Sequence, residues 1–370
     1  MNISTSTIQA KPTFKFDGIT EQICSSIAQG KLKPGDRLPL RTELAQQFNT
    51  SRVTVQKSFN DLIRDGFVVS KGKLGTFVAN NPPCLNQYGL VLPYSPTHPY
   101  WNGYYDALIQ SLHELNEILD NQIQVYYGID KPTDENYAVL YEDVKANRLA
   151  GLMFAETPHK LIVSGLMNEQ SIPMVAVMYG ESFPGLEHLL SCGFDPPSAY
   201  ELACKILKQQ GCKRIGFIML ANARQTFESI IQPILANNGL KYDPILSQSA
   251  HMEFPDEAGH VAQLLMALPP ETRPDGLYIC DDNLVSAVYR GLINAKVHVE
   301  EDLKIVSHCN FPIMPEKVLP ATNVGFDIRQ LLSTCLKRLE AKRNGDQSME
   351  YIKIKAICSD HHTTKKELPS

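Results

Sequence analysis

The stretch from Lys31 to Ala79 limits the folds open to this chain more than any other. A turn signal at 34–36 precedes a short helical pattern, and residues 49–51 break that helix and supply a hydroxyl, Ser51 or Thr50, that can cap the next one. Apolar residues then recur at helical spacing until Gly66, which suits a helix end. Two strand patterns, 67–69 and 76–78, close over a basic tip. This order predicts a winged helix-turn-helix, whose second helix enters the major groove while the wing lies beside the DNA backbone.

The same residues resemble the GntR-type winged-helix DNA-binding domain. The resemblance covers about 65 residues, 16–80, and several fixed spacings agree at once: PGDRLP, ELA, SR.TV, DGFV and GTFV. The chain departs from the family where Leu40-Arg41-Thr42 replaces Ser-Glu-Arg and where Gln56 replaces Arg, which bears on the operator sequence. An alternative is a winged helix used only for protein docking. The predicted DNA contacts are Arg41, Thr42, Ser51, Arg52, Thr54, Gln56, Lys71, Lys73 and Gly75.

The charge of the chain is divided unequally along its length. Residues 1–80 carry 11 Lys and Arg against 6 Asp and Glu, a net +5, whereas the remainder carries 24 against 34, a net −10. A basic head on an acidic body fits DNA contact confined to the head. Ile19, Ile23 and Ile27 recur four residues apart and predict a first helix for the same head.

Composition indicates a globular protein of two or three domains. The 370 residues exceed one ordinary domain, and 43% hydrophobic with 20% charged residues can bury a large core. No apolar run is long enough to cross a membrane, and the first 16 residues lack the apolar core of a signal peptide. The nine cysteines are scattered without a CxxC pair, so we expect reduced core thiols in a cytoplasmic protein.

Strand and helix patterns alternate after the stiff break at Asn80-Asn81-Pro82-Pro83. Such alternation predicts parallel sheets, and two successive series predict two α/β lobes. The last two segments are expected to cross back between the lobes. The predicted strands are 88–94, 123–126, 151–154, 173–177, 215–219, 276–280, 303–306 and 351–357. The predicted helices are 101–119, 136–148, 160–168, 198–210, 225–238, 256–268, 283–294 and 328–342.

This body resembles the effector-binding module of LacI-type repressors, which share the periplasmic-binding-protein fold. The resemblance covers about residues 87–365, and a GntR head on such a body is similar to arabinose-operon repressors of the AraR kind. It rests on four short pieces: GCKRIGF at 211–217, RPDGLYICDDN at 273–283, DLKIV at 302–306 and PATNV at 320–324. The predicted domains are a flexible arm at 1–15, the winged helix-turn-helix at 16–80, a linker at 81–87, a two-lobed effector-binding and dimerisation domain at 88–358 and a tail at 359–370.

Aromatic residues gather directly after the first strand of the body. The loop at 94–102 contains Tyr94, Tyr100 and Trp101, the only tryptophan. Binding-protein folds hold ligands between the lobes, at the carboxyl ends of the strands, so these rings lie where a ligand is expected. Aromatic faces stack on the C–H faces of sugars, which favours a sugar as effector. The alternative is that the rings pack on the surface of their lobe.

Three polar residues complete the predicted effector site. Asp282 follows the strand at 276–280, where its carboxylate can accept hydrogen bonds from ligand hydroxyls, and the matching Asp of LacI-like proteins contacts effector. Asp282 could equally cap the helix at 283–294, and for Asp195 a cap of the helix at 198–210 is favoured over ligand contact. The family's effector-contacting Arg would fall near 228–230 and is missing, so Arg224 is the candidate substitute. The run Ser307-His308-Cys309-Asn310 stands where the family usually has Gly-Phe-Asp-Asp.

These patterns predict a DNA-binding transcriptional regulator, in the first instance a repressor. Its affinity for a double-stranded operator would be controlled by a small-molecule effector, and it would act as a homodimer with no cofactor, metal or catalytic residue. No Walker A loop, GxSxG elbow or HExxH motif favours an enzyme. Two alternatives stay open: an enzyme for a sugar-like or nucleotide substrate with a DNA-targeting head, and an architectural DNA binder without a ligand.

Overall fold

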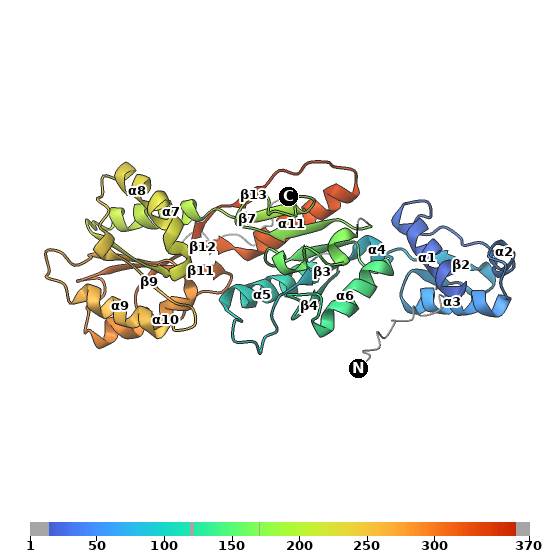
Figure 1. Cartoon of the computed structure of the whole chain (residues 1–370), viewed down its shortest axis with the longest axis horizontal. Helices are drawn as coiled ribbons and strands as arrows, with labels where there is room; N and C mark the ends of the chain where they lie inside the picture. The colour runs from blue at the N-terminus through green and yellow to red at the C-terminus, as the bar shows by residue number, and fades with distance from the viewer. Residues whose placement is uncertain (1–14, 119–121, 170, 360–370) are drawn as a thin grey trace, which may run out of the picture. The chain divides into compact units, whose positions relative to one another are not determined.

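The computed structural model describes residues 15–118, 122–169 and 171–359 (Figure 1). The predicted arm at 1–15 and tail at 359–370 lie outside these residues, apart from Lys15 and Ser359. Among the described helices, none has the length and apolar character needed to span a bilayer. All nine cysteines fall within the described residues as free thiols, and eight of them are buried.

The head is a winged helix-turn-helix, as predicted. Its first helix buries Ile19, Ile23 and Ile27 against the apolar faces of the other two helices. In the third helix Val55 and Phe59 are buried, whereas Val53 is 79% exposed although it fits the same helical period. The elements are α1 (Lys15–Ala28), α2 (Arg41–Gln47), α3 (Arg52–Arg64), β1 (Val68–Ser70), η1 (Gly72–Leu74) and β2 (Thr76–Val78).

A short helix, α4 (Pro83–Asn86), occupies the predicted linker. Pro83 stands at its first position, where a missing N–H group costs the helix nothing. Cys84 is buried in the hydrophobic core of the head, and Leu85 packs against that core. The segment after the proline pair is therefore ordered by contacts with the head.

The body contains two six-stranded sheets connected by helices, and the predicted parallel sheets are confirmed. The first sheet has the order β13-β7-β6-β5-β3-β4 and the second β14-β12-β11-β10-β8-β9. Among the pairings between strands of the body whose register is described, only that of β12 with β14 is antiparallel. The strands of the first sheet are β3 (Gln87–Val91), β4 (Gln122–Tyr126), β5 (Gly151–Phe154), β6 (Met174–Val177), β7 (Leu190–Phe194) and β13 (Ile352–Ile354). Those of the second are β8 (Ile215–Leu220), β9 (Ser247–Ala250), β10 (Gly276–Ile279), β11 (Lys304–Phe311), β12 (Thr322–Asp327) and β14 (Ile357–Cys358).

The helices of the body follow the predicted alternation closely, with one exception. They are α5 (Gly103–Ile118), α6 (Glu135–Lys145), α7 (Pro196–Gln209), α8 (Arg224–Asn237), α9 (Asp256–Met266), α10 (Asp282–Asn294) and α11 (Ile328–Arg343). The helix predicted at 160–168 is wrong, because only two 3-10 turns, η2 (His159–Leu161) and η3 (Leu166–Asn168), form there. The predicted strand at 351–357 is divided between β13 and β14, which belong to different sheets.

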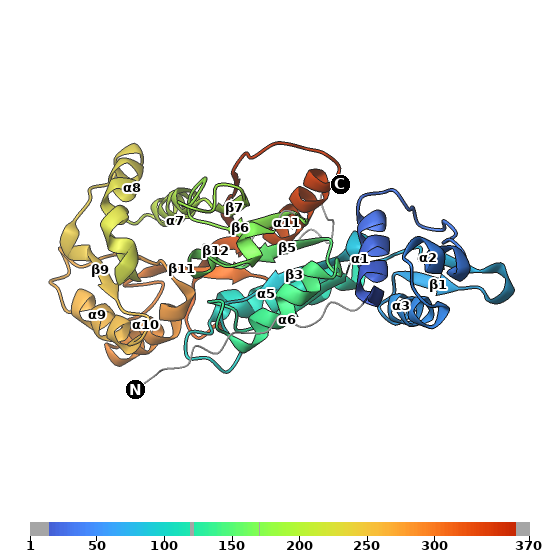
Figure 2. The same ribbon diagram turned by 45° about the vertical axis from the view of Figure 1, so that its right-hand side comes forward.

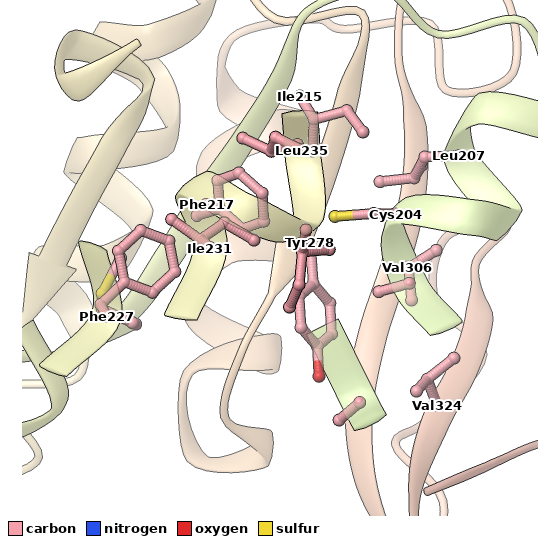
Figure 3. Close-up of a cluster of buried hydrophobic side chains, with 14 of the residues drawn as sticks. Cys204, Leu207, Ile215, Phe217, Phe227, Ile231, Leu235, Tyr278, Val306 and Val324 are labelled. Atoms are coloured by element: carbon pink, nitrogen blue, oxygen red, sulfur yellow. The ribbon is translucent and has the colours of Figure 1, made fainter. Parts of the chain in front are cut away.

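The second sheet is buried on both faces. Helices α7 and α8 cover one face and α9 and α10 the other, as both views show (Figures 1 and 2). Successive strand residues alternate between these layers: Phe217 and Tyr278 face α7 and α8, whereas Ile218 and Leu277 face α9 and α10. Figure 3 shows the first of these layers, in which Phe217, Tyr278 and Val306 meet side chains of α7 and α8. Two buried faces explain why the central strands β8 and β10 read as continuous apolar runs.

Contacts divide the chain into two compact units. The first unit contains residues up to Pro93 with Leu119–Val175 and Lys342–Asp346. The second contains Tyr94–Ile118, Ala176–Ala341 and the residues from Gln347 onward. The head and strands β3, β4 and β5 therefore lie in the first unit, and the whole second sheet lies in the second unit.

Replacing Gly325 with alanine should destabilise the second sheet severely. The added Cβ would lie 1.7 Å from the carbonyl oxygen of Cys309, a backbone atom of the paired strand that cannot move aside. We expect the free energy of unfolding in urea to fall by about 3 kcal/mol or more. The matched control is Gly18→Ala in α1, where nothing lies within 4 Å of the added atom. That variant should gain about 0.5–1 kcal/mol, and wild-type stability of Gly325→Ala would contradict the packing argument.

Candidate functional site

The first turn of α3 exposes an arginine and an apolar side chain. Ser51 caps the helix, as predicted: its Oγ accepts a hydrogen bond from the Thr54 N–H at 3.1 Å and lies 2.9 Å from Thr54 Oγ1. Arg52 and Val53, between these two residues, are exposed. An arginine beside an exposed apolar side chain can read a guanine edge and a thymine methyl in the major groove. Sequence reasoning missed Val53 because it fits the apolar period of the core residues.

Farther along α3, two exposed amide side chains lie on one helix face. Gln56 Nε2 donates to Asn60 Oδ1 at 2.8 Å, one helical turn away. Both side chains are exposed, and amide groups of this kind can pair with an adenine edge. Asn60 was not among the predicted contacts, although its spacing of four residues from Gln56 places it on the same helix face.

The wing carries its cations on a short, fixed hairpin. Strands β1 and β2 pair antiparallel, and the tip between them forms η1. Lys71 and Lys73 are exposed there, and Lys71 Nζ lies 4.9 Å from the centre of the Phe77 ring. Gly75 adopts a φ of 112°, and a Cβ at this position would lie 2.9 Å from Arg37 Nε. The glycine therefore shapes the tip, while the two lysines can reach phosphates.

Arg41 and Thr42 differ from the other predicted DNA contacts. The Arg41 guanidinium lies 4.8 Å from the centre of the buried Phe59 ring. Its Nε is buried and has no hydrogen-bond partner among the described residues. Thr42 follows it at the start of α2 and is half-buried. Arg41 is thus partly engaged in packing α2 on α3, which leaves Arg52 as the more accessible arginine.

In the body, the rings of the 94–102 loop gather around the start of α5. Tyr94 stacks on His98 with ring centres 4.5 Å apart and lies 5.6 Å from Tyr100 and 6.0 Å from Tyr105. The ring of Trp101 lies 5.1 Å from that of Tyr105. The structure therefore brings the three predicted aromatic residues into one cluster, which Tyr105 of α5 anchors because it is only 1% exposed.

The cluster continues as an aromatic row into the second sheet. Tyr104 contacts Tyr105 at 5.5 Å and meets Phe194, at the end of β7, edge-on at 5.9 Å. Phe194 stacks on Phe326 of β12 at 4.6 Å, and Phe326 lies 5.6 Å from the ring of His308. Sequence reasoning missed Tyr104, Phe194 and Phe326, because rings from three separate segments meet only when the sheets are formed.

Asp282 stands next to this row. Its carboxylate Oδ2 accepts a hydrogen bond from Asn310 Nδ2 at 2.9 Å. A Cβ on Gly103, the first residue of α5, would lie 2.7 Å from the same oxygen. The alternative that Asp282 caps the helix is wrong, because Asp281 is the N-cap of α10 and accepts from the Asn283 N–H at 3.0 Å. Asp282 is left at the first helical position, where its carboxylate faces Asn310 and Gly103.

Asn310 and His308 lie close to Asp282, and sequence reasoning noted them only as departures from a family pattern. Both belong to β11, two residues apart, and Asn310 is buried. The Nδ1 atom of His308 is buried without a hydrogen-bond partner in the described part of the chain. Burial lowers the pKa of His308, although the charge of Asp282 acts in the opposite direction. A neutral imidazole, a buried amide and a carboxylate can together bind several hydroxyl groups.

Asp195 and Arg224, the other two polar residues predicted to bind the effector, make their hydrogen bonds away from the aromatic row. Asp195 stands at the N-cap position of α7, but within the described chain its carboxylate makes no capping hydrogen bond, so the favoured cap prediction is wrong. Its carbonyl instead accepts from Ser198 Oγ at 2.7 Å. Arg224 begins α8, and its Nη1 donates to the Ser247 carbonyl oxygen at 2.9 Å, which holds β9 beside the helix. None of these contacts joins either residue to the aromatic row.

Comparisons with known proteins identify the fold of the head and of the body. Residues 16–78 match the family model for bacterial regulatory proteins of the gntR family, and residues 205–351 match that for periplasmic binding protein-like domains. The head is a GntR-type winged helix and the body has the periplasmic-binding-protein fold. Both architectural predictions are therefore confirmed.

Similarity also extends along the chain as a whole. The arabinose metabolism transcriptional repressor of Halalkalibacterium halodurans is 22% identical, over 91% of this chain and 94% of its own length. A LacI-family regulatory protein from Chloroflexus aggregans superposes with a TM-score of 0.58 and 14% identity, over 74% of this chain and 96% of its own. A LacI-family transcriptional regulator from Lactobacillus casei, solved with bound sucrose, has a TM-score of 0.50 and 19% identity, over 74% and 98%. At such identities the solved structures establish the fold of the body.

The acidic pair at the start of α10 should make stability depend on pH. Burial, and after it the charge of Asp282, raises the pKa of Asp281 to about 7, although hydrogen bonds from Asn283 lower it. The unfolded chain ionises this carboxyl near pH 4, so between about pH 4 and 7 the folded state binds more protons and loses stability as the pH rises. Asp281→Asn keeps a capping oxygen but cannot ionise. Its urea unfolding free energy should fall less over this window and exceed that of the wild type near pH 8; parallel curves would contradict the raised pKa.

Proposed function

We propose that this protein is a cytoplasmic, homodimeric transcriptional repressor that releases its operator when a small sugar binds to the body. The observation that carries the proposal is the joining, in one chain, of a GntR-type head and a periplasmic-binding-protein-like body. A relative that matches over nearly its whole length is named as a repressor of arabinose metabolism. The three proteins compared above are all named as regulators, and none is named as an enzyme.

The chemistry of the body supports a carbohydrate as the effector. The aromatic row offers ring faces for the C–H side of a sugar, and Asp282 with Asn310 offers acceptors and donors for its hydroxyls. One protein of the same fold is solved with bound sucrose, and the full-length relative is named for arabinose metabolism. Arabinose is therefore the first compound to test, followed by other monosaccharides and polyols.

Control of DNA binding requires that the sugar prefers one arrangement of the protein over another. A ligand with equal affinity for the operator-bound and released states would shift nothing. In a homodimer, two winged heads would read two half-sites about one helical turn apart, so a modest change in their spacing would weaken binding. By linkage, operator DNA should in turn weaken sugar binding by the same factor.

Arg52→Ala should reduce operator affinity by about tenfold or more, because a bidentate arginine–guanine contact contributes about 1–3 kcal/mol. The duplex would be selected from a random pool with the wild-type protein, and affinity measured by fluorescence anisotropy. Lys71→Ala is the comparison: loss of a phosphate contact should weaken all sequences alike and reduce the salt dependence. Equal affinity of Arg52→Ala and the wild type for the selected duplex would reject the assignment of α3.

Asp282→Ala should weaken arabinose binding by about tenfold or more, since a hydrogen bond to a charged group contributes about 1.5–3 kcal/mol. Calorimetric titration measures the affinity, and the sugar-induced rise in melting temperature should shrink accordingly. Operator affinity without sugar should stay at the wild-type value. Asp195→Ala serves as control, since Asp195 lies outside the aromatic row; equal losses in both variants would mean that Asp282 is not a specific sugar contact.

A further inference from the structure

The C-terminal end of α3 is held by an arginine from the body. Asp65 is the C-cap residue of α3, and its backbone N–H donates to the Asp61 carbonyl at 2.8 Å. Its carboxylate accepts from Arg64 Nε at 2.8 Å and from Arg148 Nη2 at 3.1 Å. Arg64 belongs to α3 itself, whereas Arg148 follows α6, more than 80 residues away in sequence. Both residues lie in the first compact unit.

Arg148 is itself fixed by a second carboxylate. Its Nη1 donates to Asp143 Oδ1 at 3.0 Å, and Asp143 Oδ2 accepts from the Tyr126 hydroxyl, at the end of β4, at 2.7 Å. The Arg148 N–H also donates to the Asp143 carbonyl at 2.9 Å, behind the left-handed turn at Asn147 with a φ of 55°. Arg148 is therefore part of the turn that ends α6. Its two terminal nitrogens bind different parts of the fold, Nη1 the end of α6 at Asp143 and Nη2 the end of α3 at Asp65.

The carboxylates of these two ion pairs are largely shielded from water. The side chains of Asp65 and Asp143 are 17% and 16% exposed and that of Arg148 is 38% exposed, so these pairs are less hydrated than fully exposed surface pairs, whose net contribution is small. Burial alone would raise the pKa of Asp65, but hydrogen bonds from Arg64 and Arg148 outweigh it and hold that pKa below its usual value. A three-member network also loses less side-chain entropy per contact than isolated pairs, because Arg148 is ordered once for both carboxylates.

A second cation holds the segment that follows the wing. Arg343, the last residue of α11, donates through Nη1 to the Leu85 carbonyl at 2.7 Å and lies 3.3 Å from the Tyr88 hydroxyl. Leu85 belongs to α4, which is packed on the head core through Cys84. The side of the head next to the body is thus attached at two points, at the end of α3 and at α4.

We propose that Arg148 is a positioning residue for DNA binding: by joining Asp65 to Asp143 it holds the recognition helix in the direction that the operator requires. This assignment rests on the proposed function of α3 as the DNA-reading helix. Arg148 itself acts only through α3. We call the Asp65–Arg148–Asp143 contact the clamp.

The first test needs neither DNA nor sugar. Full-length Asp65→Asn, Arg148→Gln and the double variant are digested with a broad-specificity protease, and cleavage at 80–87 is followed by mass spectrometry. Each single variant should be cleaved about fivefold faster than the wild type, and the double variant no faster than either, because both remove one shared contact. Arg273→Gln, which breaks a 2.9 Å pair with Asp302 in the second unit, is the matched control and should be cleaved at the wild-type rate. Unchanged or additive cleavage rates would overturn the clamp.

The second test separates positioning from mere attachment. Arg148→Gln should bind a selected two-half-site operator about tenfold more weakly than the wild type, yet a single half-site within about twofold, because each head is intact and only its direction is freed. Arg148→Lys, which keeps the charge but not the two-armed geometry, should lie between them. Faster cleavage with wild-type affinity for both duplexes would overturn the positioning role. If the wild type selects no DNA sequence, the regulator assignment fails. The comparison of protease cleavage rates between the single and double variants then still tests whether the clamp exists.

Discussion

Burial of the second sheet on both faces is the constraint on which the arrangement of the body depends. A polar side chain along a strand that is covered by helices on each side costs stability unless it finds a hydrogen-bond partner, as Ser307 Oγ does with Asn323 Oδ1 at 2.8 Å. The polar groups of the proposed effector site lie instead at or near strand ends. Asp281 and Asp282 follow the end of β10, and Asn310 lies near the end of β11. The carboxylate of Asp282 and the amide of Asn310 meet there, beside the aromatic row.

Within the site, one local rule assigns different roles to two neighbouring aspartates. A helix needs one N-cap acceptor, and Asp281 provides it through the Asn283 N–H. Asp282, one residue later, has helical backbone geometry, so its side chain leaves the helix start and reaches Asn310. From the sequence both residues follow a strand and precede a helix, and the pattern cannot tell which of them caps. The position of each aspartate relative to the start of the helix therefore decides which carboxylate is available to a ligand.

Much of the fold could be predicted from the sequence, because apolar periodicity and turn chemistry reflect local physics. The segments that were missed lack that local signal. Strand β9 reads Ser-Gln-Ser-Ala and is held by pairing with β8 and by the Arg224 hydrogen bond. Strand β7 contains Gly193, which packs so closely against the Met178 carbonyl that no side chain would fit. The aromatic row was visible only as far as the 94–102 loop, since Phe194 and Phe326 enter it through tertiary packing that no spacing in the sequence records.

The end at which a recognition helix is held determines how strongly its direction controls DNA binding. The 13 residues of α3 span about 20 Å, and Arg52 and Asp65 stand at opposite ends. A tilt of about ten degrees about Asp65 would displace Arg52 by about 3 Å, whereas a hydrogen bond tolerates only about 0.5 Å. Restraint at the C-cap therefore leaves the reading residues exposed while the full length of the helix amplifies any change. A contact at the first turn would obstruct Arg52, which we propose reads DNA, so the far end of α3 is where contacts from the body can control its direction.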